Sequence, residues 1–307
     1  MNLTRTISGT KLGLSRNPSL SKFCRSTMAS WNQQVGNELD KMSQKRKFAS
    51  DESLERSKYK KQKTDGDSHL LIFYDLEMCE GSMAGEIYQL GAKTSSSEFS
   101  SYILPKGSID WGVTKHVNGM KVDIDRSGRR QLMNKTKTFK TVDSIEGFRK
   151  FLAWIKEEKK AGKHEKVILI AHGDGDMPVL LNNLARDDLI KEFKSCVDYF
   201  ADSLRYFQQN FKDWDKYKVT LIYQRIFPKR EAFTAHDALE DAKALCDIIE
   251  ELGKDSRDDL VSKVLDQSFD VEKCCAMAKK RIQKTLHKSA TKKNAYNNTY
   301  CLKFCSL

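Results

Sequence analysis

Short apolar runs, each bounded by polar residues or glycine, recur along the middle of the chain. Residues 70–74 and 167–171 form runs of a length typical of buried central strands. Residues 86–92 and 99–104 predict two more strands, and residues 196–200 predict a fifth. These runs place a β-sheet in the middle of the chain, between about residue 67 and residue 253.

Apolar residues at helical spacing separate some of these strands. Asp143 and Glu146 form a capping box ahead of residues 148–155, where apolar positions recur every three or four residues. Another helix is expected from Pro178, and a third over residues 238–252, closed by Gly253. The order is three strands, a helix, a strand, a helix, a strand and a helix, which predicts a mixed α/β layer fold.

The segment from Lys254 onward shows no strand pattern. Ala278, Ile282 and Leu286 recur every four residues among lysines and arginines, which predicts a cationic amphipathic helix. Such a helix either docks on the folded core or contacts phosphates.

Charge divides the chain into three parts. The whole chain carries 54 basic and 42 acidic residues, a net charge of +12. Residues 1–66 hold 14 basic and 6 acidic side chains, and residues 254–307 hold 12 and 6. Residues 67–253 hold 28 basic and 30 acidic side chains and are close to neutral. We therefore expect a folded domain over residues 67–253. A basic arm without packed structure precedes it over residues 1–66, and a basic, partly helical tail follows it over residues 254–307. The positive charge of the arm and the tail suits binding of a polyanion.

The basic arm also resembles targeting sequences. Residues 1–27 are rich in Ser, Thr and basic residues and contain no acid, as in mitochondrial transit peptides. The basic clusters in residues 45–63 are typical of a bipartite nuclear import signal. Met28 offers an alternative start, so the sequence predicts an intracellular protein of the nucleus, the mitochondrion or both.

Cysteine spacing and hydropathy argue against a disulfide-rich protein, a zinc finger and a membrane-spanning protein. The eight cysteines form no CxxC pair and no disulfide framework. Cys274, Cys275, Cys301 and Cys305, with His287 between them, have the wrong spacing for known zinc fingers. No apolar run approaches the roughly 20 residues needed to span a bilayer.

Three groups of polar residues in the middle of the chain suggest chemistry. Asp75 and Glu77 end the first predicted strand and, two apart, point to one face. Asp176 opens a helix after a glycine-rich turn that also contains Asp174. His236 precedes the last predicted helix, which carries Asp241. Converging carboxylates are the ligands that divalent cations need for phosphodiester hydrolysis, although each group alone has an ordinary structural explanation.

These groups follow one another in a fixed order. A DxE motif ends a strand, an AH…D motif follows at a strand-to-helix turn, and an HxxxxD motif enters the last helix. This order resembles the DEDDh group of 3′→5′ exonucleases. That group includes polymerase proofreading subunits, RNase T and the animal three-prime repair exonucleases. The resemblance covers about residues 69–252. It implies a five-stranded RNase H-like sheet, two Mg²⁺ or Mn²⁺ ions held by Asp75, Glu77, Asp176 and Asp241, and His236 as general base.

The same resemblance implies substrate contacts at DNA or RNA 3′ ends, with release of nucleoside 5′-monophosphates. It assigns them to Leu76, Trp111, Asn118, Met120 and His172, although Trp111 would equally suit a position in the apolar core. Three features depart from the family pattern: Met78 replaces a common Thr, Gly173 replaces a common Asn, and the turn before Asp176 is short, which leaves Asp174 as the alternative ligand. The Asp176-x-Pro178-x-Leu180 pattern leans toward the three-prime repair branch.

Two questions stay open at this level. The first is whether the substrate is DNA or RNA, single-stranded or duplex, since a 2′-hydroxyl contact cannot be identified in the sequence. The second is whether the protein cuts nucleic acid at all. The alternative is a catalytically inactive protein of the same fold that binds nucleic acid.

Overall fold

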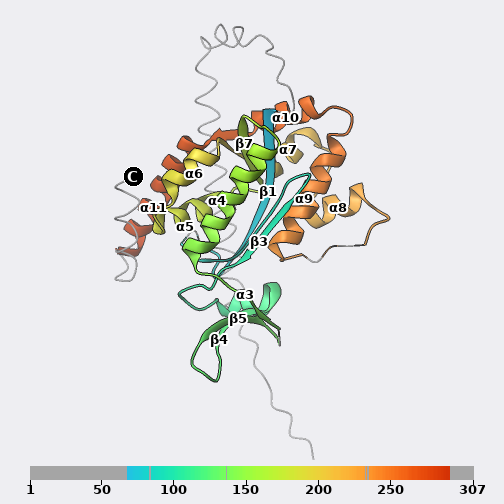
Figure 1. Cartoon of the computed structure of the whole chain (residues 1–307). Coiled ribbons are helices and arrows are strands. Elements are labelled where there is room, and N and C mark those ends of the chain that lie inside the picture. Colours follow the sequence, from blue (N-terminus) through green and yellow to red (C-terminus); the bar gives the residue numbers. More distant parts are fainter. Residues whose placement is uncertain (1–67, 83, 136, 232, 234, 291–307) are drawn as a thin grey trace, which may run out of the picture. The chain divides into compact units, whose positions relative to one another are not determined.

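A central mixed sheet of six strands organises the part of the chain that the computed structural model describes, residues 68–290 except 83, 136, 232 and 234 (Figure 1). The strand order is β3-β2-β1-β7-β8-β9. Strands β1, β7 and β8 are parallel, whereas β2, β3 and β9 run antiparallel to their neighbours. The strands are β1 (His69–Met78), β2 (Ile87–Lys93), β3 (Glu98–Tyr102), β7 (Lys166–Ala171), β8 (Tyr199–Asp202) and β9 (Ser268–Asp270).

Helices cover both faces of this sheet. One face packs against α4 (Ser144–Ala161), α5 (Asp176–Arg186), α6 (Ile190–Cys196) and α11 (Val271–Ala290). The other packs against α7 (Ser203–Asn210), α8 (Val219–Ile226), α9 (Ala238–Leu252) and α10 (Arg257–Asp266). Strand β1 serves both layers, because Leu70, Ile72 and Tyr74 point into the first and Leu71 and Phe73 into the second. The predicted mixed α/β layer fold is confirmed.

A smaller sheet lies between β3 and α4 in the chain, where the sequence predicted no strands. It consists of β4 (Met120–Ile124), β5 (Arg130–Asn134) and β6 (Lys137–Phe139). A short helix, α3 (Trp111–Val113), and a π-helical turn, η2 (Thr114–Asn118), lead into it. Met120 and Leu132 from this sheet share a small apolar core with Cys79, Ile109 and Tyr88 of β2.

The C-terminal segment differs from the sequence prediction in one respect. It contains a strand, because β9 pairs with β8 and adds a sixth strand to the five that were expected. After β9, Val271, Cys274 and Ala278 of α11 are buried in the main core. Up to Ala278 the helix docks on the fold, as one of the two interpretations of its pattern predicted.

The bounds predicted for the fifth strand, residues 196–200, were wrong. Cys196 ends helix α6, and β8 begins at Tyr199. The apolar residues of this stretch are buried in both elements, so hydrophobicity alone does not separate the helix end from the strand start. The predicted targeting signals and the Cys301 and Cys305 pair lie outside the described residues. Among the described helices, none combines the length and apolar composition required to cross a bilayer.

Candidate metal centre

Three carboxylates converge at the end of β1. One oxygen each from Asp75, Glu77 and Asp241 lie within 4.8 Å of one another. Asp75 and Glu77 alternate with the buried Leu76, so both face the layer that contains α9. Asp241 lies on the first turn of α9, which packs against β1 and β2.

Gly91 of β2 allows α9 to approach this closely. It lies directly opposite Asp75 in the β1–β2 ladder. A Cβ atom at Gly91 would overlap backbone atoms of Ala238 and Leu239 at the start of α9. The helix N-terminus therefore rests on bare backbone, three residues before Asp241. This long-range contact was not visible in the sequence, where Gly91 appeared only as a member of the second strand.

Asp176 reaches the same edge of the sheet from β7. Strand β7 runs parallel to β1 and ends at Ala171, and after a short turn Asp176 begins α5. Its charge raises the pKa of Asp75 more than any other neighbour does, and it also raises the pKa of Glu77. Asp174 contributes instead to the pKa of Asp202. The electrostatics thus favour Asp176 over Asp174, although the 4.8 Å cluster itself contains three residues and not Asp176.

Burial raises the pKa values of all four carboxyl groups, and repulsion from other members of the group adds to the effect for Asp75, Glu77 and Asp176. Burial is the largest cause in each case, followed for Asp75 by the charge of Asp176. The pKa of Glu77 rises to about 8 and that of Asp176 to about 7. The pKa of Asp241 is also raised, against the effect of the His236 backbone N–H that bonds to it.

No lysine or arginine among the described residues forms an ion pair with any of these four acids. Buried carboxylates without a cationic partner are costly to ionise. Hard oxygen ligands gathered in this way suit a divalent cation such as Mg²⁺ or Mn²⁺. The donor set therefore fits a metal site.

A hydrogen-bond chain connects the acids to His236. Tyr88 Oη donates to Glu77 Oε2 at 3.1 Å. The Asn118 side-chain amide donates both to Tyr88 Oη, at 2.8 Å, and to the backbone carbonyl of His236, at 3.0 Å. The His236 N–H donates to Asp241 Oδ2 at 2.8 Å. His236 has a φ of 67°, a costly conformation for a non-glycine residue. The hydrogen bonds of its carbonyl with Asn118 and of its N–H with Asp241 hold the backbone in this conformation.

A second chain fixes the start of α9. Asp237 caps the helix and accepts from the N–H of Leu239 at 3.1 Å. It also accepts from Gln89 Nε2 at 3.0 Å and from Tyr102 Oη at 3.3 Å. Gln89, Tyr102 and Tyr88 belong to no motif that could be recognised in the sequence. The signal in hindsight is that Gln89 and Gly91 alternate on β2 opposite Glu77 and Asp75.

A profile of the Exuperantia RNAse H-like domain family matches residues 69–225, just over half of the chain. The chain belongs to this family. Maternal protein exuperantia of Drosophila melanogaster is 26% identical over 141 residues, which cover 45% of this chain and 26% of that protein. The chain therefore spans about a quarter of the length of this relative. The Exuperantia RNAse H-like match includes Asp75, Glu77 and Asp176 and ends before His236 and Asp241.

Solved structures of exonucleases are distantly similar to this Exuperantia-family chain. One is described as "3'-end specific recognition of histone mRNA stem-loop by 3'-exonuclease", with 14% identity and a TM-score of 0.42. Another is described as a "crystal structure of full-length 3'-exonuclease", with 16% identity and a TM-score of 0.42. Each comparison covers 62% of this chain and 83% of the other.

The five predicted substrate residues have different environments in this Exuperantia-family domain. Trp111 is 71% exposed, whereas Leu76 and Met120 are buried in apolar cores. Asn118 is engaged in the chain to His236 described above. Both ring nitrogens of His172 are in hydrogen bonds, with Ser203 Oγ and with the Tyr217 carbonyl, and burial lowers its pKa. Trp111 thus offers an exposed surface, and a substrate role for all five residues stays a prediction.

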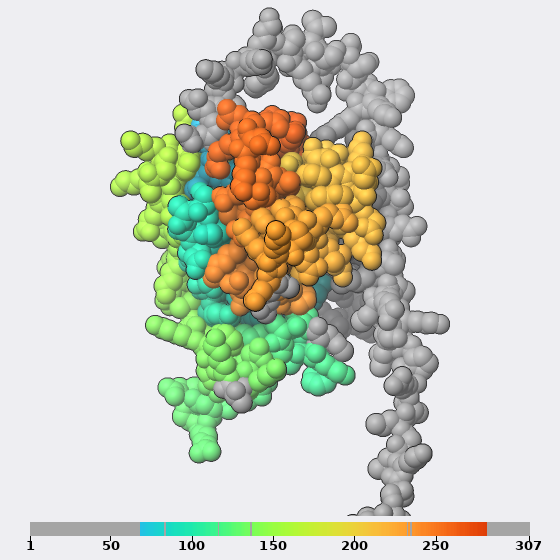
Figure 2. All heavy atoms as spheres, turned by 90° about the vertical axis from the view of Figure 1, so that its right-hand side faces the viewer, coloured from blue at the N-terminus to red at the C-terminus, as the bar shows by residue number. Residues whose placement is uncertain are grey.

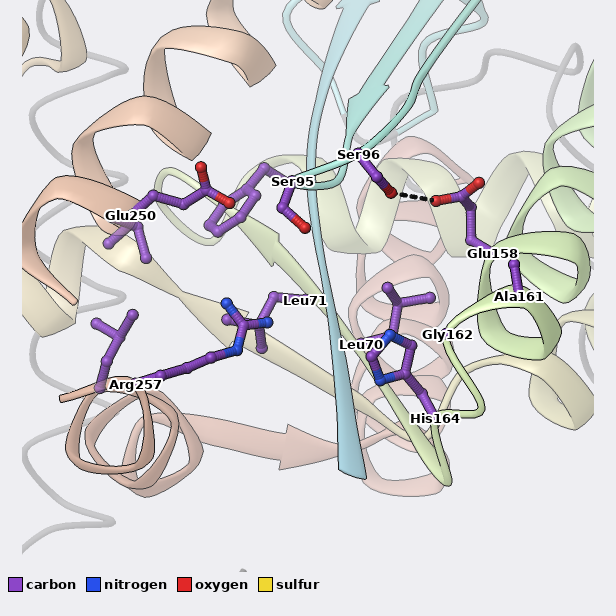
Figure 3. A pocket seen from close by; sticks show the side chains of 13 residues that line it. Leu70, Leu71, Ser95, Ser96, Glu158, Ala161, Gly162, His164, Glu250 and Arg257 are labelled. Carbon is purple, nitrogen blue, oxygen red and sulfur yellow. Dashed lines mark hydrogen bonds between the residues drawn. The ribbon is translucent and has the colours of Figure 1, made fainter. Parts of the chain in front are cut away.

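A pocket of about 510 Å³ lies at the other end of β1, about 20 Å from Glu77 along the strand. Figure 3 shows Glu250 and Arg257 on one side of β1 and Ser96, Glu158 and His164 on the other. Glu158 accepts hydrogen bonds from Thr94 and Ser96 in the β2–β3 turn. The pocket is therefore separate from the four acids.

Proposed function

We propose that the chain is a metal-dependent 3′→5′ exonuclease that releases nucleoside 5′-monophosphates from DNA or RNA. The observation that carries this proposal is the convergence of Asp75, Glu77 and Asp241 within 4.8 Å, with Glu77 buried and the other two half-buried. No lysine or arginine among the described residues pairs with any of them. Asp176 supplements this group through its position at the start of α5. The arrangement agrees with the DEDDh pattern to which the sequence is similar.

Asp75, Glu77, Asp176 and Asp241 would hold two divalent ions, Mg²⁺ or Mn²⁺. When bound, such ions activate the attacking water and stabilise the negative charge on the leaving 3′ oxygen. Burial, and to a lesser extent repulsion between the acids, raises the pKa values of Asp75 and Glu77, and a bound cation would offset both costs of ionisation. The four side chains also fix where the scissile phosphate is placed.

His236 is the proposed general base. Its imidazole lies close enough to Asp241 to lower the pKa of that carboxyl group. The side chain is exposed, so it can take a proton from water and release it to solvent. Asn118 and Asp241 hold its backbone, as described above.

The test is cleavage of a 5′-labelled single-stranded DNA and a matching RNA, with Mg²⁺ or with EDTA. Wild-type protein should produce a ladder that shortens from the 3′ end, and EDTA or Asp75→Ala should abolish it. Asp176→Asn and Asp174→Asn form a matched pair. If Asp176 is the ligand, only the first should lower the rate, by about 100-fold or more.

Intact oligonucleotides with both Mg²⁺ and Mn²⁺, from protein that still binds them in a salt-sensitive manner, would reject the enzyme. The chain would then be a nucleic-acid-binding member of the fold without catalysis. Comparison of the two ladders would also rank DNA against RNA as substrate.

A further inference from the structure

Positive charge within residues 67–253 is concentrated in one segment. Residues 111–140, which form α3, η2 and the small sheet and which we name the basic insertion, contain eight basic and two acidic residues. The other residues of 67–253 contain 20 basic and 28 acidic residues. The net charge of the domain is therefore near zero because an acidic main body and a basic insertion offset each other. The two parts produce electrostatic potentials of opposite sign.

The cations of the basic insertion point into solvent. The exposed residues among them are Lys115, Lys121, Arg126, Arg129, Arg130, Lys135, Lys137 and Lys140. Lys121 pairs with Asp123 and Arg129 with Asp125, which uses both of the acids. Within the described part of the chain, Arg126, Lys135 and Lys140 form no ion pair. Such unpaired cations attract a polyanion.

The basic insertion also presents an aromatic surface. The Trp111 side chain is 71% exposed, and Lys115 Nζ lies 5.8 Å from the centre of its ring. Lys137 Nζ lies 4.8 Å from the ring of Phe139. A cation-flanked exposed tryptophan is a surface on which nucleobases stack, while the lysines contact phosphates.

This surface begins at the acidic cluster. Asn118 of the basic insertion donates to Tyr88, the partner of Glu77, and to the His236 carbonyl. The Phe139 ring lies 4.4 Å from that of Tyr102, whose hydroxyl donates to Asp237. Figures 1 and 2 both show the basic insertion projecting at the lower end of the domain.

We propose that the basic insertion binds the sugar–phosphate backbone of a single nucleic acid strand whose 3′ end lies at Asp75, Glu77 and Asp241. This inference rests on the proposed function and adds to it a binding surface for nucleotides upstream of the scissile bond. The chemistry recognised is a run of phosphodiesters with stackable bases, which DNA and RNA share. Strand length, rather than base sequence, governs affinity at this surface.

The test is equilibrium binding of the full chain to labelled oligothymidylate and oligouridylate of about 4 and about 20 nucleotides, in EDTA and over a range of salt. The test variant is Arg126→Gln, Lys135→Gln, Lys140→Gln. The matched control is Lys160→Gln, Lys191→Gln, Lys273→Gln, three exposed lysines on α4, α6 and α11. Circular dichroism checks that both variants are folded.

We expect the test variant to bind the long oligonucleotides at least about tenfold more weakly near 0.1 M salt. The slope of log affinity against log salt should decrease in size by about 2, since each contact with a single strand contributes about 0.7. The control and the short oligonucleotides should show little change. Comparison of oligothymidylate with oligouridylate shows whether the surface distinguishes a DNA backbone from an RNA backbone.

Equal binding of long strands by test variant and wild type would overturn the inference, as would absence of binding by the wild type. Equal binding together with 3′-end cleavage in Mg²⁺ would reject this surface and leave the exonuclease standing. Weakened binding by the test variant, with no cleavage by any form of the protein, would reject the exonuclease and support the surface.

Discussion

Replacement of Gly91 by alanine should separate the two elements that build the candidate metal centre. The added Cβ would overlap the backbone of Ala238 and Leu239. The two backbones must move apart by about 1 Å before an ordinary contact of about 3.5 Å is restored. Because Asp241 lies one turn further along α9, it moves away from Asp75 with the helix. We expect the rate of cleavage to fall by about 100-fold and divalent-ion affinity to fall with it.

Calorimetric titration with Mn²⁺ measures the affinity, and the labelled-oligonucleotide assay measures the rate. Thermal unfolding should show a cost of about 1–3 kcal/mol, as expected for overpacking. Gly81→Ala is the matched control, because a Cβ at Gly81 meets nothing within 4 Å. If folded Gly91→Ala protein bound Mn²⁺ with wild-type affinity, the close approach of α9 would not be what positions Asp241, and the reasoning would fail.

Three further predictions concern the site and the fold. Tyr88→Phe removes the donor to Glu77 and should weaken Mn²⁺ binding about tenfold, measured by calorimetry; unchanged affinity would show that this bond does not orient Glu77. In EDTA the melting temperature should fall as the pH rises through 7 and 8. The raised pKa values of Glu77 and Asp176 mean that the folded state binds more protons than the unfolded state, so stability is full below about pH 4 and is lost as the pH passes these values. Mg²⁺ should raise the melting temperature mainly above about pH 7. A melting temperature independent of pH would contradict the raised pKa values of Glu77 and Asp176. Ala278→Glu, at a 1% exposed position of α11, should lower the melting temperature strongly while the exposed Ala276→Glu does not; equal effects would mean that α11 is not packed as described.

The main sheet was accessible from the sequence because its central strands are buried on both faces. Residues 70–74 and 167–171 are continuous apolar runs, and such runs have few alternatives to a central strand. The small sheet β4–β6 was missed for the opposite reason. Its residues are exposed or half-buried except for Met120 and Leu132, so the local pattern carries little signal. Its position depends on the distant Cys79 and Tyr88, which local periodicity does not reveal.

Asp237 and Asp241 show where sequence reasoning about the site ends. They lie four residues apart, Asp237 as the N-cap of α9 and Asp241 in its first turn. In the structure, Asp237 is committed to the N–H of Leu239, to Gln89 and to Tyr102, and its oxygens are satisfied by protein donors. Asp241 accepts the backbone N–H of His236 and lies with Asp75 and Glu77 in the 4.8 Å cluster, and no lysine or arginine among the described residues pairs with it. Two identical side chains on one helix thus divide into a structural cap and a candidate ligand, and the division depends on which residues β2 and β3 place beside them.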